Sequence, residues 1–255
     1  MLTGIVDLVL LAGQIILENG GETFRVEETM GRMALAAGAK TVDVFVVPQG
    51  IFCTIFIGEQ SQTRVLRIHR RGFNLAKVLE VNRISRQLAD EVLTVEMAYE
   101  ELLKVYRLPR RYPTWIRLLA GGIASAAFCY LLGARSFSVL LAGITGLLIM
   151  FVMEFLQKRE VLGFIALAIA GFIAAVVNLA AKLIWPGMEF NLTVIGSLMI
   201  LVPGLAITTS VRDALFEDLI SAAIRGVEAF GVALSIASGV GSVLALYLWL
   251  GGTLP

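Results

Sequence analysis

The residues best suited to chemistry lie in one stretch near the end of the chain, LVPGLAITTSVRDALFEDLISAAIRG, residues 201–226. Its first half contains a Pro-Gly pair and then three consecutive hydroxyl residues: Pro203, Gly204, Thr208, Thr209 and Ser210. Because a proline removes one backbone donor and clashes with the preceding turn, we expect a helix to break here. A broken helix at membrane depth is typical of substrate sites in many transporters. The hydroxyl groups could bind a polar solute, or alternatively bond back to their own backbone.

The second half of this stretch combines acidic and basic residues at helical spacing. Asp218, Ser221, Arg225 and Glu228 fall within a narrow arc of a helical projection. This pattern predicts an amphipathic helix at a membrane surface that continues into the next apolar run. Glu228 lies just inside that run, where an ionisable group is usually paired or functional, and Arg225 is its nearest partner in sequence.

These charges allow two kinds of role. Asp213, Asp218 or Glu228 could exchange protons. Arg212 or Arg225 could bind a carboxylate, because a guanidinium offers two parallel donors. The alternative is that the charges only cap helices and face water.

A second group of charges, Glu22, Arg25 and Glu27, lies early in the chain. Residues 22 and 25 are one helical turn apart, so a carboxylate and a guanidinium could face one cleft. The alternative is a solvated helix face with a local ion pair worth about 0.3 kcal/mol.

His69, the only histidine, has no second His or Cys nearby to complete a metal site. We therefore expect no metal ion and no cofactor, and the sequence contains neither a nucleotide-binding G-x-x-x-x-G-K-[ST] loop nor an H-E-x-x-H motif.

The composition places the chain in the membrane class. Its 255 residues are 58% hydrophobic and 16% charged, whereas soluble domains carry roughly 25% charge. The formal net charge of +1 argues against a nucleic-acid partner, which would require a basic surface. Cys53 and Cys129 fall in different predicted domains, so we expect two unlinked thiols.

The first predicted domain, residues 1–108, contains most of the charged residues. It is predicted to be a cytoplasmic α+β domain with the element order α-α-β-β-β-α-α, from the spacing of apolar residues and from β-branched and aromatic runs. The expected helices cover about 1–18, 22–37, 74–90 and 94–107, and the expected strands about 40–48, 51–58 and 63–70. The apolar first segment is interpreted as an amphipathic helix ended by Asn19-Gly20-Gly21, because it lacks the basic region and cleavage site of a signal peptide.

The second predicted domain, residues 109–255, is expected to be an all-α bundle of five transmembrane helices. Five windows approach the roughly 20 apolar residues that cross a bilayer: 115–133, 138–156, 161–184, 190–210 and 227–250. The basic residues gather at three connections: Lys104, Arg107, Arg110, Arg111 and Arg117, then Lys158 and Arg159, then Arg212 and Arg225. By the positive-inside rule these connections are cytoplasmic and Pro255 lies outside. Small residues in the spans predict close helix packing, within the chain or alternatively against another chain.

Four segments together carry a family pattern: NGGETFRVEETMGRMALAAGA, VPQGIF, LAKVLEVNRISRQLA and LVPGLAITTSVRDALFEDLISAAIRGVEA. On these segments, which follow one another over nearly the whole chain, the sequence resembles the bacterial threonine/serine exporter family. The resemblance implies a bacterial inner-membrane protein that exports small amino acids or dicarboxylates such as succinate, driven by the proton gradient. The positions that match the family pattern are Glu22, Arg25, Glu27, Pro203, Gly204, Asp213, Asp218, Arg225 and Gly226.

The resemblance also implies a partner. The family contains long single chains and split pairs, and this sequence, which ends after its fifth predicted span, resembles the larger subunit of the split, succinate-exporter-like form. A shorter four-helix-type membrane protein is therefore the expected partner, with a homo-oligomer as a further option. Two other hypotheses stay open beside the exporter: a hydrolase-like enzyme that uses Glu22 and Glu27, and a membrane-anchored scaffold or regulator.

Overall fold

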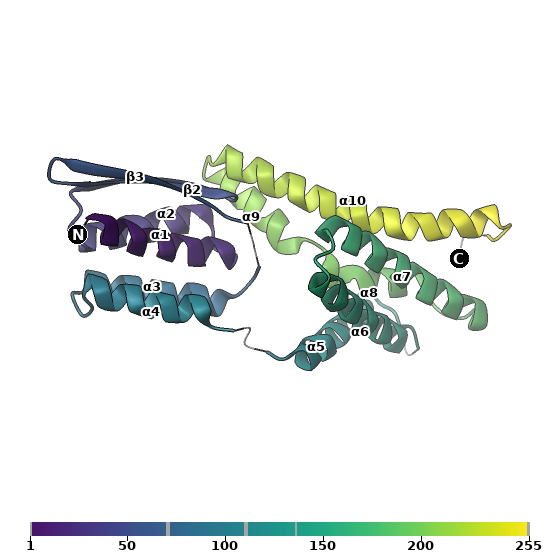
Figure 1. Cartoon of the computed structure of the whole chain (residues 1–255). Helices are drawn as coiled ribbons and strands as arrows, with labels where there is room; N and C mark the ends of the chain where they lie inside the picture. Colours follow the sequence, from purple (N-terminus) through teal and green to yellow (C-terminus); the bar gives the residue numbers. More distant parts are fainter. Residues whose placement is uncertain (1, 70–71, 110–111, 136, 254–255) are drawn as a thin grey trace. The chain divides into compact units, whose positions relative to one another are not determined.

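The structure is a computed structural model that describes residues 2–69, 72–109, 112–135 and 137–253 (Figure 1). Several residues named above lie outside the described residues: Arg70 at the end of the third expected strand, Arg110, Arg111 and Pro255. The chain divides into two compact units, one made of Met1–Pro109 with Thr209–Arg225 and the other of Arg110–Thr208 with Gly226–Pro255. The division into functional domains at residue 108 stays a prediction.

The first unit has the predicted element order. Its elements before residue 109 are α1 (Leu2–Glu18), α2 (Thr23–Ala36), β1 (Thr41–Val47), β2 (Gly50–Ile57), β3 (Gln60–Arg67), α3 (Leu75–Ala89) and α4 (Val95–Arg107). In Figure 1, α1 and α2 form a layer with the sheet on one side and α3 and α4 on the other, in agreement with the contacts of α2 with β1 and of α1 with α4. The expected α+β fold is confirmed, whereas its cytoplasmic position stays a prediction.

The three strands form an antiparallel meander in the order β1-β2-β3. Val47 pairs with Gly50 across the turn at Pro48 and Gln49, between the two strands that the sequence predicted at about 40–48 and 51–58. Along β2 the side chains alternate, because successive residues of a strand point to opposite faces. Cys53 is buried on the face toward the helices, and burial raises the pKa of its thiol to about 11. Cys53 and Cys129 are both free, as expected.

Helix α1 occupies the centre of this unit. Most of its side chains, among them Val6, Leu8 and Ile15, are buried, because α2 lies beside it and the sheet and the α3–α4 layer cover its two sides. The expected amphipathic helix is confirmed: Asp7, Gln14 and Glu18 form a narrow half-buried stripe, and most of the remaining circumference of α1 is buried. It ends in the predicted Asn-Gly-Gly turn, where Gly20 has a φ of +89°, a conformation that glycine adopts without strain.

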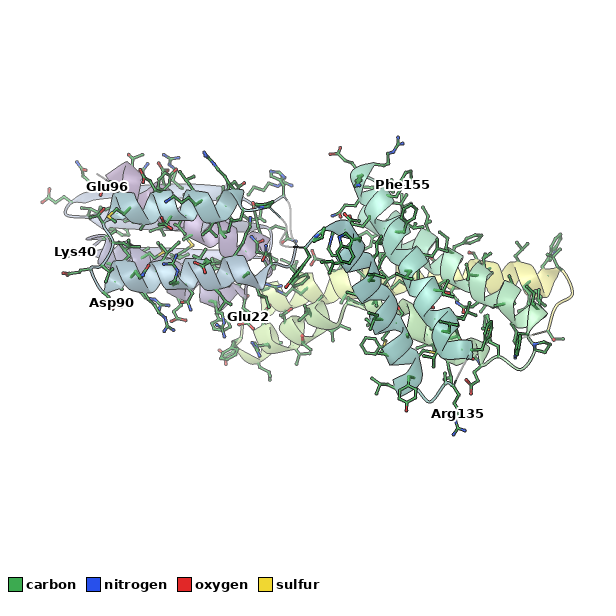
Figure 2. The ribbon with its side chains drawn as sticks, turned by 90° about the horizontal axis from the view of Figure 1, so that it is seen from below. Glu22, Lys40, Asp90, Glu96, Arg135 and Phe155 are labelled. Atoms are coloured by element: carbon green, nitrogen blue, oxygen red, sulfur yellow. The ribbon has the colours of Figure 1, made fainter. Side chains whose placement is uncertain are left out.

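The second unit is helical. Its long helices are α5 (Thr114–Leu131), α6 (Phe137–Lys158), α7 (Gly163–Ile184) and the greater part of α10 (Leu219–Trp249). Each of these helices is long and apolar enough to cross a membrane. Figure 2 shows Arg135, just before α6, and Phe155, near the end of α6, at opposite ends of that helix. Glu154, beside Phe155, forms an ion pair with Arg117 of α5.

Small residues bring these helices together within the chain. On α6, a side chain at Gly146 would collide with Ser125 of α5, and on α10 one at Gly239 would collide with the backbone of Ala168 in α7. Close backbone approach of this kind is the use of small residues in membrane helices. Of the two alternatives left open by the sequence, packing within the chain is the one observed at these positions.

The fourth predicted span, 190–210, is a broken helix. It consists of α8 (Phe190–Leu198), the short 3-10 helix η1 (Met199–Leu201) and α9 (Gly204–Leu215), with a bend of 62° at the break. Val202 is extended, with a φ of −60° and a ψ of 131°, as is usual for a residue before proline. The predicted break at Pro203 is confirmed. The described residues hold four helices that could cross a membrane, or five if the bent pair is one span.

Candidate functional site

The start of α2 meets the turn between α9 and α10 inside the first unit. Thr23, the first residue of α2, is buried and donates a hydrogen bond from Oγ1 to Oδ2 of Asp218, over 3.0 Å. Phe24 stacks on Phe216, with the ring centroids 5.4 Å apart. The contact joins residues that are 195 positions apart in the sequence.

Asp218 holds this turn in place. Its Oδ1 accepts a hydrogen bond from the backbone N–H of Ser221 over 3.1 Å, so it caps the N-terminus of α10, where a negative charge is favourable. The preceding residue, Glu217, has a φ of +64°, which is an unusual backbone conformation for a residue other than glycine. It occurs because the N–H groups of Glu217 and Asp218 bond back to Ala214 and Asp213, as in a helix that ends with a Schellman motif.

Asp213 and Arg225 form a buried ion pair across this turn. Nε of Arg225 lies 3.0 Å from Oδ2 of Asp213, at ion-pair distance but without the alignment of a hydrogen bond. The side chain of Asp213 is 2% exposed and that of Arg225 is 12% exposed. Arg225 also donates from Nη2 to the backbone carbonyl of Gly21 over 3.4 Å. Since buried polar atoms are normally hydrogen-bonded, this pair retains unused hydrogen-bonding capacity.

Glu22 lies between two guanidinium groups. Its Oε2 accepts from Nε of Arg25 over 2.9 Å, and its Oε1 pairs with Nη1 of Arg212. The sequence left open whether Glu22 and Arg25 line a cleft or form a local ion pair. The ion pair is present, and Arg212 connects it to α9. Figure 2 shows Glu22 at one end of the first unit and Lys40, Asp90 and Glu96 at the other end.

Glu27 lies one turn further along α2. Its Oε1 accepts a hydrogen bond from the backbone N–H of Val46 over 2.9 Å. Burial raises the pKa of this carboxyl above its usual range, the Val46 donor lowers it in part, and the charge of Asp218 raises it further. Glu27 is therefore suited to hold a proton under conditions in which an exposed glutamate is ionised.

Glu27 opens onto a cavity of about 400 Å³, which we call the acidic pocket. It is lined by Thr23, Phe24, Glu27, Phe45, Val46, Asp213, Phe216, Glu217, Asp218, Leu219 and Ile220. Four of these side chains are carboxylic acids, and none of the lining residues in the described chain is Lys or Arg. Such a pocket favours a cationic or zwitterionic ligand, with the aromatic rings available to its apolar part.

The structure brings together seven of the predicted residues in this region: Glu22, Arg25, Glu27, Arg212, Asp213, Asp218 and Arg225. The hydroxyl residues lie elsewhere. Thr208 bonds back to the carbonyls of Gly204 and Leu205, and Ser210 donates to the carbonyl of Ala222 over 2.7 Å. Back-bonding to the helix is the alternative that the sequence left open, and it is the one observed for Thr208.

The remaining predicted residues do not line the acidic pocket. Pro203 and Gly204 form the helix break, Thr209 lies within α9, and Glu228 lies within α10. Arg225 lies against Asp213, a contact that the sequence did not predict, and its expected pairing with Glu228 stays a prediction. The pairing with Asp213 follows from the turn at residues 216–218, which folds the end of α9 back toward α10.

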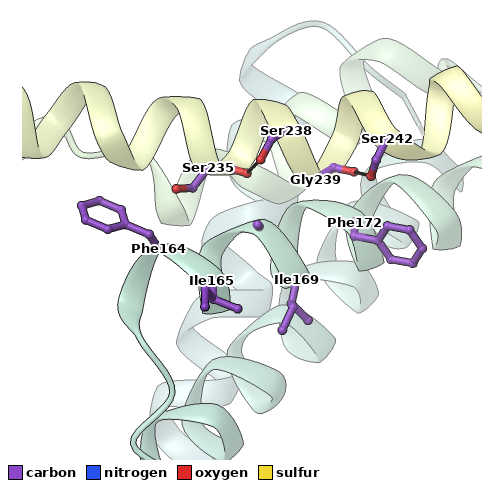
Figure 3. Close-up of a pocket in the computed structure, with 9 residues that line it drawn as sticks. Phe164, Ile165, Ile169, Phe172, Ser235, Ser238, Gly239 and Ser242 are labelled. Carbon is purple, nitrogen blue, oxygen red and sulfur yellow. Dashed lines mark hydrogen bonds between the residues drawn. The ribbon is translucent and has the colours of Figure 1, made fainter.

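A second cavity, of about 490 Å³, lies between α7 and α10 in the second unit (Figure 3). Phe164, Ile165, Ile169 and Phe172 face Ser235, Ser238 and Ser242 across it. Each serine hydroxyl donates to a carbonyl of its own helix over 2.8 Å, so its only proton is already used. This wall is largely apolar and suits hydrocarbon better than a charged solute, which leaves the acidic pocket as the stronger candidate.

Sequence reasoning missed two contributors to the site. Thr23 and Phe24 were not singled out, although both contact the turn that contains Phe216 and Asp218. A local pattern could not identify them, because their partners lie almost 200 residues away. The one sequence feature that could have pointed to Thr23 is its position at the start of a predicted helix, next to the charged residues Glu22 and Arg25.

Four helices long and apolar enough to cross a bilayer, together with a bent helix pair broken at Pro203-Gly204, indicate a multi-pass membrane protein. The chain belongs to the threonine/serine exporter family: the family model described as "Putative threonine/serine exporter" matches residues 7–247. The family suggested by the sequence is thus confirmed.

Relatives over the full length carry the name of a transporter subunit. The chain is 25% identical over 245 residues to the "Probable succinate transporter subunit YjjP" of Escherichia coli (strain K12), covering 95% of this chain and 93% of that protein. It is 22% identical to a "Probable threonine/serine exporter" of Mycobacterium tuberculosis, of which it covers 44% while 92% of this chain is matched. No solved structure matches the chain.

Proposed function

We propose that the chain is a subunit of an inner-membrane exporter of small amino acids or dicarboxylates, driven by the proton gradient. The first unit lies in the cytoplasm, and a shorter four-helix-type membrane protein completes the exporter, as the word "subunit" in the names of two relatives suggests. A transport role is proposed rather than catalysis, because the family and its named relatives are transporters.

The observation that carries this proposal is the buried Asp213–Arg225 pair beside the acidic pocket. While Asp213 is ionised, it holds the guanidinium of Arg225. A proton on Asp213 removes that charge, and Arg225 can then bind the carboxylate of a substrate through two parallel hydrogen bonds. Loss of the proton restores the pair and displaces the substrate, which couples proton movement to release.

The lining of the acidic pocket bears on the substrate class. Its four carboxylic acids attract an ammonium group and repel a second carboxylate. Threonine and serine each carry one ammonium and one carboxylate, whereas succinate carries two carboxylates. The charge of the pocket therefore favours an amino acid, even though relatives named for both substrate types exist.

Efflux from proteoliposomes tests the proposal. Vesicles with the full chain, alone and with its shorter partner, are loaded with labelled threonine, serine or succinate, and efflux is followed with and without a pH gradient. We expect gradient-dependent efflux that Asp213→Asn abolishes, whereas Asp43→Asn, an exposed change on β1, leaves it intact. Efflux that ignores the gradient in every preparation would refute the coupling.

The scaffold hypothesis makes the opposite prediction for the same residues. If the first unit only binds a regulatory partner, replacing Asp218 or Arg225 by alanine should leave efflux unchanged. If the transport proposal is correct, both variants lose efflux while the protein still reaches the membrane, because Asp218 and Arg225 hold the site together.

A further inference from the structure

A third cavity, of about 140 Å³, lies between α2 and α3 and is unrelated to any residue assigned above except Arg25. We call it the arginine pocket. Its polar lining consists of Arg25, Glu28, Thr29, Arg32, Asn82 and Arg86, and its apolar lining of Ile16, Val78 and Leu79. The two helices lie in neighbouring layers of the first unit (Figure 1).

Positive charge exceeds negative charge in this pocket. Three guanidinium groups line it against one carboxylate, that of Glu28, which pairs with Arg32 over 3.1 Å. Arg25 pairs with Glu22 over 2.9 Å. Arg86 forms no side-chain hydrogen bond or ion pair with any residue that the structure describes. One guanidinium group at the edge of the pocket thus has all its donors available.

The size and donors of the arginine pocket define its ligand. Its volume is several times the roughly 30 Å³ that a water molecule occupies in the liquid, which is enough for a small oxyanion but not for a nucleotide. Guanidinium groups, an amide and a hydroxyl are the side chains that bind phosphate and carboxylate oxygens. We propose that the arginine pocket binds a small oxyanion, a free phosphate or the phosphate or carboxylate group of a small metabolite.

Binding at this pocket is connected to the candidate transport site through Arg25. The guanidinium of Arg25 lines the arginine pocket and also holds Glu22, whose other oxygen pairs with Arg212 of α9. A bound oxyanion competes with Glu22 for Arg25. The site therefore offers a way for a cytoplasmic anion to loosen the link between α2 and α9.

Equilibrium binding to the purified full chain in detergent tests the proposal, with inorganic phosphate and succinate as separate probes at constant ionic strength. Arg86→Gln should weaken binding of the preferred probe by about tenfold or more, the loss of one charge-assisted hydrogen bond. Arg83→Gln is the matched control, because Arg83 lies on the same helix but pairs with Glu80 and Gln87 and does not line the pocket. It should change the dissociation constant less than twofold.

A second variant is expected to change the binding affinity in the opposite direction. Glu22→Gln removes the competitor for Arg25 and should tighten binding several-fold. The proposal is overturned if neither probe binds, if Arg86→Gln and wild type bind equally, or if Arg83→Gln weakens binding as much as Arg86→Gln does. Because binding is measured without transport, failure of the exporter proposal does not affect the result.

Discussion

At the level of single residues, the Asp213–Arg225 pair has an energetic consequence that can be measured. Removing one partner of a buried pair leaves an uncompensated charge, at a cost of about 3 kcal/mol or more. Asp213→Asn and Arg225→Gln should therefore each lower the free energy of unfolding markedly. The double variant should lose less than the sum of the two, by about 1 kcal/mol or more. Chemical unfolding in detergent measures this, and strict additivity would show that the two side chains do not interact.

Glu27 gives the candidate site a predictable pH dependence. Burial raises the pKa of Glu27 in the folded protein, so between the ordinary glutamate pKa of about 4.3 and the raised value the folded state binds more protons than the unfolded state. The free energy of unfolding must then fall as the pH rises through this window. Glu27→Gln should remove that fall. Thermal midpoints measured across the window for both proteins provide the check, and an equal slope in the variant would contradict the assignment.

At the level of elements, apolar spacing and turn residues were sufficient to predict the helices and strands before residue 109, but not that Thr209–Arg225 belongs to the same unit. Pro48 and Gln49 mark the turn between β1 and β2, and Pro203 marks the helix break, because both depend on local backbone chemistry. Strand β3 begins at Gln60 rather than at about 63. Its polar first residues, 60–62, pair through the backbone with residues 55–57 of β2, and backbone pairing does not require apolar side chains. The first turns of α10, before the predicted span, are continuous with the span.

The packing of α10 on α7 provides an element-level prediction with a control on the same helix. A methyl group at Gly239 would collide with the backbone of Ala168 and with Phe172, whereas one at Gly241 would meet nothing within 4 Å. Gly239→Ala should destabilise the second unit by about 1–3 kcal/mol, the usual cost of overpacking, and Gly241→Ala should not. Thermal unfolding in detergent compares the two. Equal midpoints for both variants would show that α7 and α10 do not pack closely.

For the molecule as a whole, the charged motifs were visible in the sequence but their meeting was not. Glu22 and Asp218 each belong to a recognisable segment, yet their neighbourhood depends on Thr23 reaching Asp218 over 195 positions. The spacing of apolar residues is a local pattern, so it cannot predict a contact between residues 195 positions apart. The contact between Thr23 and Asp218 also bears on the number of membrane crossings. Because the two side chains are hydrogen-bonded, they must lie on one side of the membrane. Thr23 precedes α5 and Asp218 precedes α10, so the crossings between them are those of α5, α6, α7 and the bent α8–α9 pair. An even number of crossings separates them, which favours one span for the bent α8–α9 pair and five spans in total.

Labelling of single cysteines tests this arrangement and its orientation. In a background with Cys53→Ala and Cys129→Ala, we place one cysteine at Glu96, Arg135, Lys158 or Gly251, all exposed positions. With five spans and a cytoplasmic first unit, an impermeant maleimide should label positions 135 and 251 in intact spheroplasts. It should reach positions 96 and 158 only after permeabilisation.

If the bent pair were a re-entrant loop, α10 would run in the opposite direction and position 251 would be protected like position 96. Labelling at 251 therefore separates the two topologies, and labelling at 96 in intact spheroplasts would reverse the orientation expected from the basic residues.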